Sequence, residues 1–158
     1  MLIERTKVPG VIILTPDVYK DDRGYFKETL NKYMNFIPVQ ANQSISSKGV
    51  IRGLHYQSHT AKLVWVAKGS IYDVAVDPET GAWHGEELSD QNHKQLLCPA
   101  NFLHGFQALE DDTVVCYLMD QPYNQKTEGG YNPDFIDWPI EDAVISEKDR
   151  NADKLDPK

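Results

Sequence analysis

The chain has 158 residues, of which 41% are hydrophobic and 25% are charged, and its formal net charge is −8. This size and composition predict one soluble globular domain over residues 1–158, and no apolar run approaches the roughly 20 residues that a membrane-spanning helix needs. The acidic balance disfavours a surface for nucleic acid, although a local cluster of Arg and Lys can still hold a phosphate group on an acidic protein.

Short apolar or alternating runs, separated by turn residues, recur along the chain and predict β-strands. The first run, Val11–Leu14, is followed by a turn at Lys20–Gly24. The later runs are rich in Val, Ile, Tyr and Trp, which favour strands. They are Gly49–Gln57, Leu63–Ala67, Ile71–Val76, Gln95–Cys98, Phe102–Leu109 and Thr113–Met119. Many short strands at regular spacing predict an all-β sandwich or barrel.

Helical patterns are sparse. One set of apolar residues at helical spacing permits a short helix between strands, and its members are Phe26, Leu30, Tyr33 or Met34, and Ile37. Ser146 to Asp149 has the pattern of a helix N-terminal cap and predicts a last turn or two of helix. The prediction is therefore an all-β fold with minor helix.

The N-terminal segment and the cysteines both indicate a cytoplasmic protein. Residues 1–7 mix acidic and basic side chains and no long apolar core follows them, so we expect no signal peptide. Cys98 and Cys116 lie in apolar runs and form no CxxC pair. Buried free thiols are the simplest interpretation, with a single disulfide as the alternative.

The segment Arg52-Gly53-Leu54-His55-Tyr56-Gln57 places a histidine inside a predicted strand. Strict alternation along a strand predicts that Gly53, His55 and Gln57 share one face and that Arg52 lies on the other. A polar face inside a sandwich costs stability unless it lines a cavity, so we predict a cavity here, with room at Gly53. Three further titratable groups lie in or next to other strand-like runs: Lys62, His104 and Tyr117.

Each of these residues also has an ordinary structural explanation. Taken alone, His55 suits a hydrogen-bonded core histidine, Tyr117 suits a core tyrosine, and Lys62 suits a charged guard at a strand edge. Asp149 suits the predicted helix cap, and Arg23 suits an ordinary turn. Lys148 suits a solvated surface cation.

A metal site is the alternative use for histidines on neighbouring strands. The candidates are His55, His59 and His104, but such sites usually combine a close His-x-His pair with a carboxylate. The second residue after His55 is Gln57, and Lys62 places a cation where an acid is needed. We therefore expect no bound metal. Three histidines are expected at the surface without a role: His59, His84 and His93.

A series of longer motifs runs in order along nearly the whole chain. Its members are Asp21–Glu28, Gln40–Ser44, Gly49–Gln57, Lys62–Val64, Tyr72–Asp77, Lys94–Leu96, Pro99–Phe106, Glu128–Gly129, Trp138–Pro139 and Ser146–Asp149. In this order they resemble the motifs of the dTDP-4-dehydrorhamnose 3,5-epimerases. The resemblance implies a cupin-type jelly roll that acts as a homodimer on a nucleotide-linked 4-keto-6-deoxyhexose and needs no cofactor.

The resemblance also implies roles for individual residues. His55 is the general base, oriented by Asp149, and Tyr117 is the general acid on the opposite face of the sugar. Lys62, with His104, stabilises the enolate oxygen. The implied substrate-binding residues are Arg23, Glu28, Gln40, Asn42, Arg52, Glu128 and Lys148.

Elementary chemistry agrees with the implied roles. Removal of a proton from the carbon next to a ketone needs a base and a partner for the oxyanion that develops. Histidine, with an unperturbed pKa of about 6.5, suits the base, and a carboxylate on its far nitrogen fixes the tautomer. An ammonium group can stabilise the enolate oxygen, and a tyrosine can return the proton from the other face. No Rossmann-type or P-loop glycine pattern is present, so no nicotinamide is implied.

The sequence therefore predicts a C3 and C5 epimerase of dTDP-4-dehydro-6-deoxyglucose in deoxysugar or surface-polysaccharide biosynthesis. Two segments, Asp77–Trp83 and Gly130–Trp138, look shorter than is usual in the family, which leaves the sugar and the epimerised positions open. The alternatives are a single-position epimerase, a 3,4-ketoisomerase, a metal-dependent cupin enzyme, or a non-catalytic module that binds sugar nucleotides.

Overall fold

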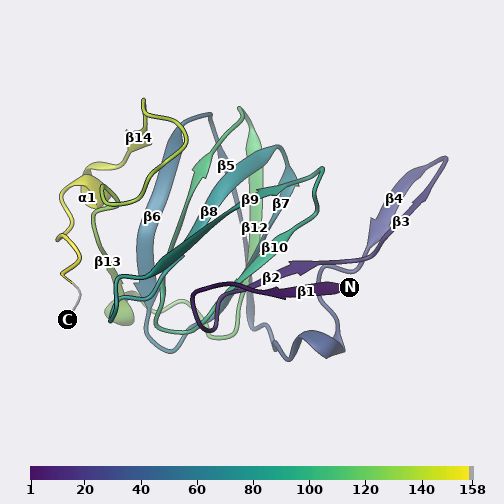
Figure 1. Cartoon of the computed structure of the whole chain (residues 1–158), viewed down its shortest axis with the longest axis horizontal. Helices are drawn as coiled ribbons and strands as arrows, with labels where there is room; N and C mark the ends of the chain where they lie inside the picture. Colours follow the sequence, from purple (N-terminus) through teal and green to yellow (C-terminus); the bar gives the residue numbers. More distant parts are fainter. Residues whose placement is uncertain (157–158) are drawn as a thin grey trace.

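The computed structural model describes residues 1–156, and nearly all of its regular structure is β-strand (Figure 1). One sheet has the strand order β1-β2-β10-β7-β12-β5. Its strands are β1 (Leu2–Arg5), β2 (Ile12–Thr15), β5 (Gln40–Ser46), β7 (Lys62–Lys68), β10 (Gln95–Cys98) and β12 (Thr113–Met119). We call this the first sheet.

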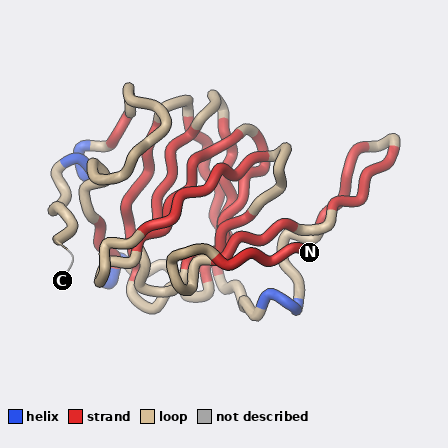
Figure 2. Tube along the Cα trace, viewed as in Figure 1, coloured by secondary structure: helices blue, strands red, loops and turns tan. Residues whose placement is uncertain are grey.

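The second sheet has the order β13-β6-β11-β8-β9, and β14 pairs with β6 in parallel. Its strands are β6 (Val50–Gln57), β8 (Ser70–Val76), β9 (Trp83–Ser89), β11 (Leu103–Ala108), β13 (Glu128–Gly130) and β14 (Val144–Ile145). Two further strands, β3 (Val18–Asp21) and β4 (Gly24–Lys27), form a separate hairpin that projects from the sandwich (Figures 1 and 2).

Helix is confined to three short pieces, shown in blue in Figure 2. They are the 3-10 helices η1 (Lys32–Met34) and η2 (Gln125–Thr127) and the α-helix α1 (Glu147–Arg150). No helix among the described residues is long and apolar enough to cross a membrane. The predicted all-β sandwich with minor helix is therefore confirmed.

The apolar core of the described residues has three clusters. Two lie on the two faces of the second sheet, and the third, of Leu14, Met34 and Leu63, packs against the first sheet. Between the two sheets, Val64 and Val115 of the first pack with Ile71 and Ala75 of the second. On the outer face, Leu54, Val74 and other apolar residues pack against the C-terminal segment. That segment includes Tyr131, Ile136, Trp138 and Leu155. Burial on both faces explains why β8 reads as a nearly continuous apolar run.

The strand predictions are confirmed where side chains are apolar and fail where strands carry polar or exposed residues. Gln95–Cys98 and Thr113–Met119 match β10 and β12 exactly. Strand β5 was not predicted, because its inward side chains are polar and its outward residues Ala41 and Ile45 are exposed. Strand β9 was missed for a similar reason, since His84, Glu86 and Glu87 give it a polar sequence.

The spacing from Phe26 to Ile37, which permits a short helix, gives only the 3-10 turn η1 between β4 and β5. Phe26 lies in β4, where it pairs with Tyr19 of β3, and the only helical turn nearby is η1. Phe26 and Ile37 are 64% and 80% exposed, so these apolar residues do not form one buried face. Helical spacing stabilises a helix only when its apolar stripe packs against a core.

Candidate active site

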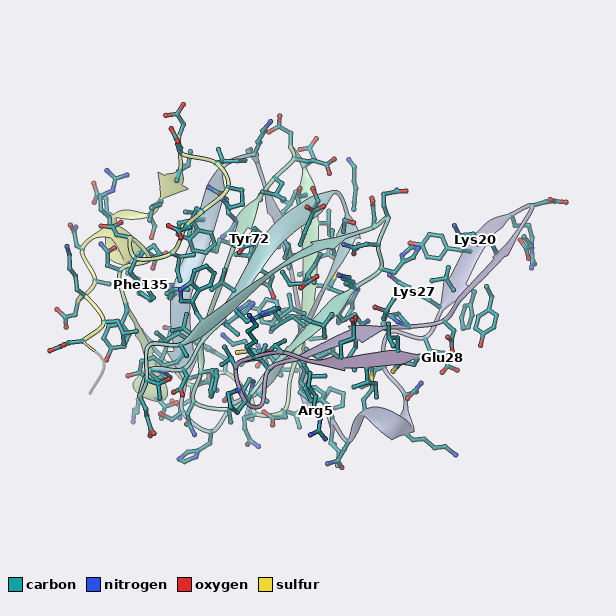
Figure 3. The ribbon with its side chains drawn as sticks, viewed as in Figure 1. Arg5, Lys20, Lys27, Glu28, Tyr72 and Phe135 are labelled. Atoms are coloured by element: carbon teal, nitrogen blue, oxygen red, sulfur yellow. The ribbon has the colours of Figure 1, made fainter. Side chains whose placement is uncertain are left out.

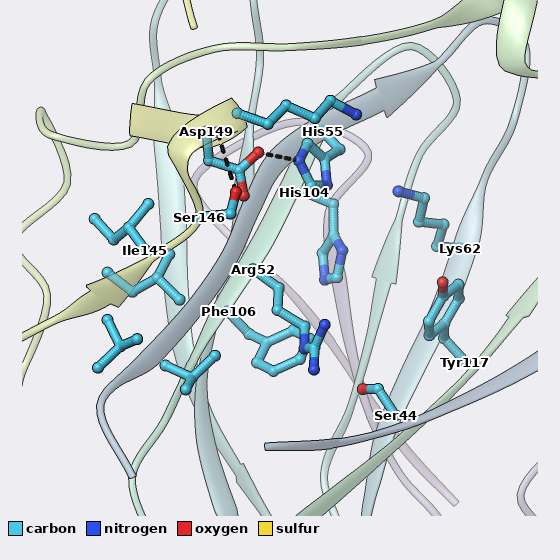
Figure 4. Close-up of a pocket in the computed structure, with 14 residues that line it drawn as sticks. Ser44, Arg52, His55, Lys62, His104, Phe106, Tyr117, Ile145, Ser146 and Asp149 are labelled. Atoms are coloured by element: carbon cyan, nitrogen blue, oxygen red, sulfur yellow. Dashed lines mark hydrogen bonds and ion pairs between the residues drawn. The ribbon is translucent and has the colours of Figure 1, made fainter. Parts of the chain in front are cut away.

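A cavity of about 510 Å³ lies between the two sheets and next to the segment that contains β14 and α1 (Figure 4). All five residues predicted to carry chemistry line it: His55, Lys62, His104, Tyr117 and Asp149. Two of the predicted binding residues, Arg52 and Lys148, also line it. These residues come from β6, β7, β11, β12 and α1, so the site exists only once the sandwich has formed.

A β-bulge brings Arg52 and His55 to the same face of β6. Arg52 is opposite Phe106 of β11 and His55 is opposite His104, so β6 has two intervening residues where β11 has one. The predicted alternation, with Arg52 on the far face, is therefore wrong. An extra residue in one strand of an antiparallel pair shifts the pleat and redirects the side chains that follow it.

The backbone of this bulge requires a glycine at position 53. The glycine does not leave room beside His55. Gly53 has a φ of +130°, a conformation that residues with a Cβ seldom adopt. A Cβ at this position would lie 2.6 Å from the Cα of Gly105. The two strands therefore approach each other too closely for any side chain at Gly53.

His55 of β6 and Asp149 of α1 form a close pair. His55 Nε2 lies 2.6 Å from Asp149 Oδ1, and the side chain of Asp149 is only 7% exposed. Ser146 Oγ accepts a hydrogen bond from the backbone N–H of Asp149, which confirms the predicted N-cap. The cap uses the backbone of Asp149 and the pair uses its carboxylate, so both functions coexist. With Nε2 engaged, Nδ1 of His55 is the nitrogen left for a substrate proton.

Lys62 and Tyr117 face this pair from the first sheet. Register places Tyr117 opposite Val64 and Lys62 opposite Met119, so both side chains point to the same face of that sheet. Burial lowers the pKa of Lys62, although negative groups around it, including Asp73 and Glu128, act in the opposite direction. Burial also raises the pKa of the Tyr117 phenol. Lys62 is therefore a desolvated cation, and Tyr117 stays protonated at neutral pH.

His104 lies in this view between the His55–Asp149 pair and Lys62 (Figure 4). Its Nε2 is 2.8 Å from Oδ1 of Asp73, a residue of β8 that is fully buried. The cavity lining thus includes the His55–Asp149 pair, His104 backed by Asp73, and the ammonium groups of Lys62 and Lys148. Such a set can remove a proton on one side and stabilise an oxyanion in the middle.

Comparison with known proteins identifies the family of the chain. Residues 5–157 match the family model of dTDP-4-dehydrorhamnose 3,5-epimerase. The chain belongs to this family of sugar-nucleotide isomerases. It is 44% identical to the dTDP-4-dehydrorhamnose 3,5-epimerase of Methanothermobacter thermautotrophicus over 93% of this chain and 90% of that protein.

Two solved structures of the family illustrate the shared fold. The dTDP-4-dehydrorhamnose 3,5-epimerase of Elizabethkingia anophelis superposes with a TM-score of 0.90 at 38% identity, covering 98% of this chain and 96% of that one. The Legionella pneumophila dTDP-6-deoxy-D-glucose-3,5-epimerase, solved in complex with dTDP-4-keto-L-rhamnose, also has a TM-score of 0.90, at 36% identity and coverages of 98% and 92%. The predicted cupin-type jelly roll is thereby confirmed.

Two of the three cations predicted to bind substrate, Arg52 and Lys148, line the cavity. Arg52 donates from Nε to Ser46 Oγ at 3.0 Å and from Nη2 to the Ile45 carbonyl at 3.1 Å, which anchors its guanidinium on β5. Lys148 has a side chain that is 69% exposed, and its Nζ lies 3.5 Å from Glu128 Oε2. Glu128 lies beside the cavity rather than in its lining. Both cations are placed to meet an anionic group that enters from solvent.

Gln40 and Asn42 lie on the cavity side of β5 but outside the cavity lining. Asn42 is opposite Tyr117 in the register, and its Oδ1 accepts a hydrogen bond from Gln40 Nε2 at 2.9 Å. Gln40 Oε1 accepts from the backbone N–H of Tyr123. These bonds connect β5 to the loop before η2, so the two amides border the site next to the tyrosine.

Arg23 and Glu28 are not brought to this cavity. Arg23 lies in the turn of the β3–β4 hairpin, where it pairs with Asp21, and its side chain is 90% exposed. Glu28 follows β4, and Figure 3 shows it on the projecting side of the molecule, away from Tyr72 of the second sheet. The predicted turn at this hairpin is confirmed, but its two binding residues are separate from the cavity of their own chain.

The sequence analysis missed two polar residues of the site. Asp73 is the counterpart of His104, and Ser44, on the inner face of β5, lines the cavity with a hydroxyl that has no partner among the described residues. An acidic residue in the middle of the apolar run Ile71–Val76 was the available signal for Asp73. Ser44 ends the motif Gln40–Ser44 but was given no role, and its place on an inner strand face was missed because that strand was not predicted.

The remaining histidines and the cysteines complete the comparison with the sequence. His93, expected at the surface, is only 9% exposed, because its ring packs on Tyr25 and its Nδ1 contacts Lys27 of the hairpin. Cys98 is buried and Cys116 is partly buried, and both are free thiols. Residues 1–156 contain no group of three His, Cys, Asp or Glu side chains with the geometry of a metal site.

Proposed function

We propose that residues 1–158 act as one domain that epimerises C3 and C5 of dTDP-4-dehydro-6-deoxyglucose. The observation that carries the proposal is the arrangement of groups across the cavity. The His55–Asp149 pair belongs to the second sheet and its attached helix, Tyr117 belongs to the first sheet, and Lys62 and His104 complete the lining between them. A base and an acid on facing sheets are what inversion at carbon requires.

The first half of the reaction uses His55. Its Nδ1 takes the proton from the carbon next to the 4-keto group, while Nε2–H remains hydrogen-bonded to Asp149. The electron pair of the broken C–H bond moves onto the carbonyl oxygen and forms an enolate. Lys62 and His104 stabilise that negative charge, and one preorganised donor of this kind contributes about 10²–10³-fold in rate.

The second half returns a proton from the opposite face. Tyr117 gives its phenolic proton to the same carbon, which becomes inverted, and the enolate reverts to the ketone. Because burial raises its pKa, Tyr117 begins the step protonated at neutral pH. The phenolate and the imidazolium then exchange protons with solvent before the next position reacts.

Arg52 and Lys148 supply the charge for the diphosphate of the substrate. They are the two exposed cations of the cavity lining, and Arg52 is held in place by two hydrogen bonds to β5. A guanidinium is well suited to bidentate contact with phosphate oxygens. The Legionella relative in complex with dTDP-4-keto-L-rhamnose supports a substrate of this class. The proposed setting is deoxysugar biosynthesis in the cytoplasm, where Cys98 and Cys116 stay reduced.

We further propose that the protein works as a homodimer in which the β3–β4 hairpin reaches the partner's cavity. The hairpin carries Arg23 and Glu28 away from the cavity of its own chain. It also exposes Tyr19, Tyr25 and Phe26, at 62%, 50% and 64%. Exposed aromatic residues next to binding residues mark an interaction surface. Light scattering at two concentrations tests the assembly, and a monomer at both would contradict it.

Deuterium exchange tests the reaction. The protein is incubated with dTDP-4-dehydro-6-deoxyglucose in D₂O, and C3 and C5 are followed by NMR. We expect exchange at both positions together with an inverted product. Exchange at one position only would make the protein a single-position epimerase, and migration of the carbonyl would make it a 3,4-ketoisomerase. Binding of dTDP without any exchange would contradict catalysis, and activity lost on chelation with stoichiometric metal would indicate a metal-dependent enzyme.

A further inference from the structure

The fully buried carboxylate of Asp73 lies beside the cavity in a place where an apolar residue would be expected. On the inward face of β8, its neighbours Ile71 and Ala75 belong to the core between the sheets. Asp73 has an exposed fraction of 0%, and only one of its two oxygens is used, by His104 Nε2 at 2.8 Å. Its Oδ2 has no hydrogen-bond partner among the described residues.

An unpaired carboxylate oxygen in a core is costly, and such groups persist when positive charge compensates them. Lys62 supplies a positive charge that interacts with the Asp73 carboxylate. Burial lowers the pKa of Lys62, and the negative charge of Asp73 is one of the influences that oppose this shift. Four other titratable groups surround the ammonium: Cys98 opposite it on β10, Glu128 on β13, and His104 and Tyr117 in the cavity lining.

The hydrogen bond to Asp73 also determines which nitrogen of His104 remains available. A carboxylate accepts hydrogen bonds only, so Nε2 carries a proton in this pair. Among the described residues, no hydrogen bond engages Nδ1 of His104. The histidine therefore presents Nδ1 for a ligand. His55 has the same arrangement with Asp149, but that carboxylate belongs to a helix at the surface, whereas Asp73 belongs to the core.

We propose that Asp73 is a positioning residue that acts on the oxyanion side of the site through His104 and Lys62. It holds the His104 ring, protonated on Nε2 and on Nδ1, with Nδ1–H directed to donate to the 4-keto oxygen, and its negative charge stabilises the neighbouring ammonium of Lys62. When the enolate forms, its charge lies against cations that are already in place, so little reorganisation is needed. This inference rests on the proposed epimerase reaction.

The main variant is Asp73→Asn, which keeps the size of the side chain and its acceptor oxygen but removes the charge. We expect kcat to fall about 10–100-fold, as for other outer partners of active-site histidines, with KM changed less than about twofold. The alkaline limb of the pH profile should move to lower pH, because Lys62 loses its proton more easily without Asp73. Wild-type kcat and an unmoved limb in this variant would overturn the proposal.

Asp77→Asn is the matched control. Asp77 follows the same strand, and its Oδ1 accepts from the backbone N–H of Glu79 in the turn after β8, outside the cavity. An asparagine can keep that hydrogen bond, so both kcat and the pH profile should stay at wild-type values. Circular dichroism and thermal unfolding of both variants separate a loss of folding from a loss of function. A pH limb that moves equally in both variants would overturn the specific role of Asp73.

A measurement on the free protein separates this inference from the proposed reaction. ¹⁵N NMR of the wild type should show His104 with protons on both Nε2 and Nδ1, and a titration of Lys62 should give a lower pKa in Asp73→Asn than in the wild type. Neither observation needs a substrate. A His104 with a proton on one nitrogen only would overturn the proposal, even if the wild type epimerises its substrate. Absence of epimerisation with the expected protonation and shift would instead contradict only the proposed function.

Discussion

The cavity and the β3–β4 hairpin both carry residues that the family motifs assign to substrate, but they are built in opposite ways. In the cavity, His55 and His104 are each held by a carboxylate, and Arg52 is anchored on β5. On the hairpin, Arg23 contacts Asp21 of its own turn and is otherwise exposed to solvent. The cavity is organised within one chain, whereas the hairpin exposes the aromatic residues Tyr19, Tyr25 and Phe26 to solvent.

This difference separates the two parts of the proposed function. Groups that move protons are fixed by neighbours inside the sandwich, where low exposure strengthens each electrostatic contact. Groups assigned to binding lie on the rim or on the hairpin, where they meet solvent. Variants in the cavity should therefore change kcat, and variants in the hairpin should change KM and assembly.

The largest effect is expected for His55→Ala. Loss of the base should reduce deuterium exchange at C3 and C5 by about 10³–10⁴-fold, while dTDP binding is kept. NMR in D₂O measures the exchange, and calorimetry measures the binding. His84→Ala is the control, because His84 pairs with Glu86 on β9 outside the cavity. Exchange near the wild-type rate in His55→Ala would remove His55 from the role of base.

Tyr117→Phe should separate the two faces of the cavity. Without the phenolic proton, formation of inverted product should fall about 10²–10³-fold. Deuterium exchange with retained configuration should continue, because His55 still removes the proton and can return one from the same side. The ratio of exchange to inversion, read from one NMR time course, measures this. Equal losses of exchange and inversion would place Tyr117 in proton removal instead.

The protonation state of Lys62 should make kcat depend on pH. Its pKa is lowered by burial from the usual value of about 10.4, so the ammonium is lost as pH rises through a range below that value. We expect kcat to fall along this alkaline limb. In Lys62→Arg the limb should move to higher pH, because the guanidinium keeps its charge, and kcat at neutral pH should fall about tenfold through changed geometry. An identical limb in both proteins would assign it to another group.

The smallest effect on chemistry is expected in the hairpin. Arg23→Ala should raise KM about tenfold with little change in kcat, as for the loss of one charged hydrogen bond, and should leave thermal stability unchanged. A mixing experiment sharpens the comparison. If the hairpin serves the partner's cavity, hybrid dimers of Arg23→Ala and His55→Ala contain one complete site, so activity at low substrate concentration should exceed that of either variant alone. Activity equal to the sum of the separate variants would place Arg23 in its own chain's site.

Much of the site was predictable because its residues lie in short sequence motifs. The strands β10 and β12 follow directly from apolar runs, and the cap of α1 follows from Ser146. His55, Lys62, His104, Tyr117 and Asp149 were all named from the sequence, and all line one cavity. Local patterns succeed here because strand propensity, capping and reactive side chains depend on neighbouring residues in the chain.

The features that the sequence did not predict all depend on contacts between distant segments. The polar inner face of β5 makes sense only because it borders a cavity, and a strict alternation rule could not place Arg52 beside His55. His93 is buried only because the hairpin packs on it. In each case the decisive neighbour is a strand or loop far away in the sequence.

By itself, the sequence determined the class of fold, the family and the identity of the groups that are proposed to perform the chemistry. Only the tertiary structure decided how those groups are arranged. The bulge between β6 and β11 directs Arg52 and His55 into one cavity, the pairing of β8 with β11 brings Asp73 to His104, and the projection of the hairpin separates Arg23 from both. The physical reason is that register and close approach are properties of paired strands, and a single strand read in isolation carries neither.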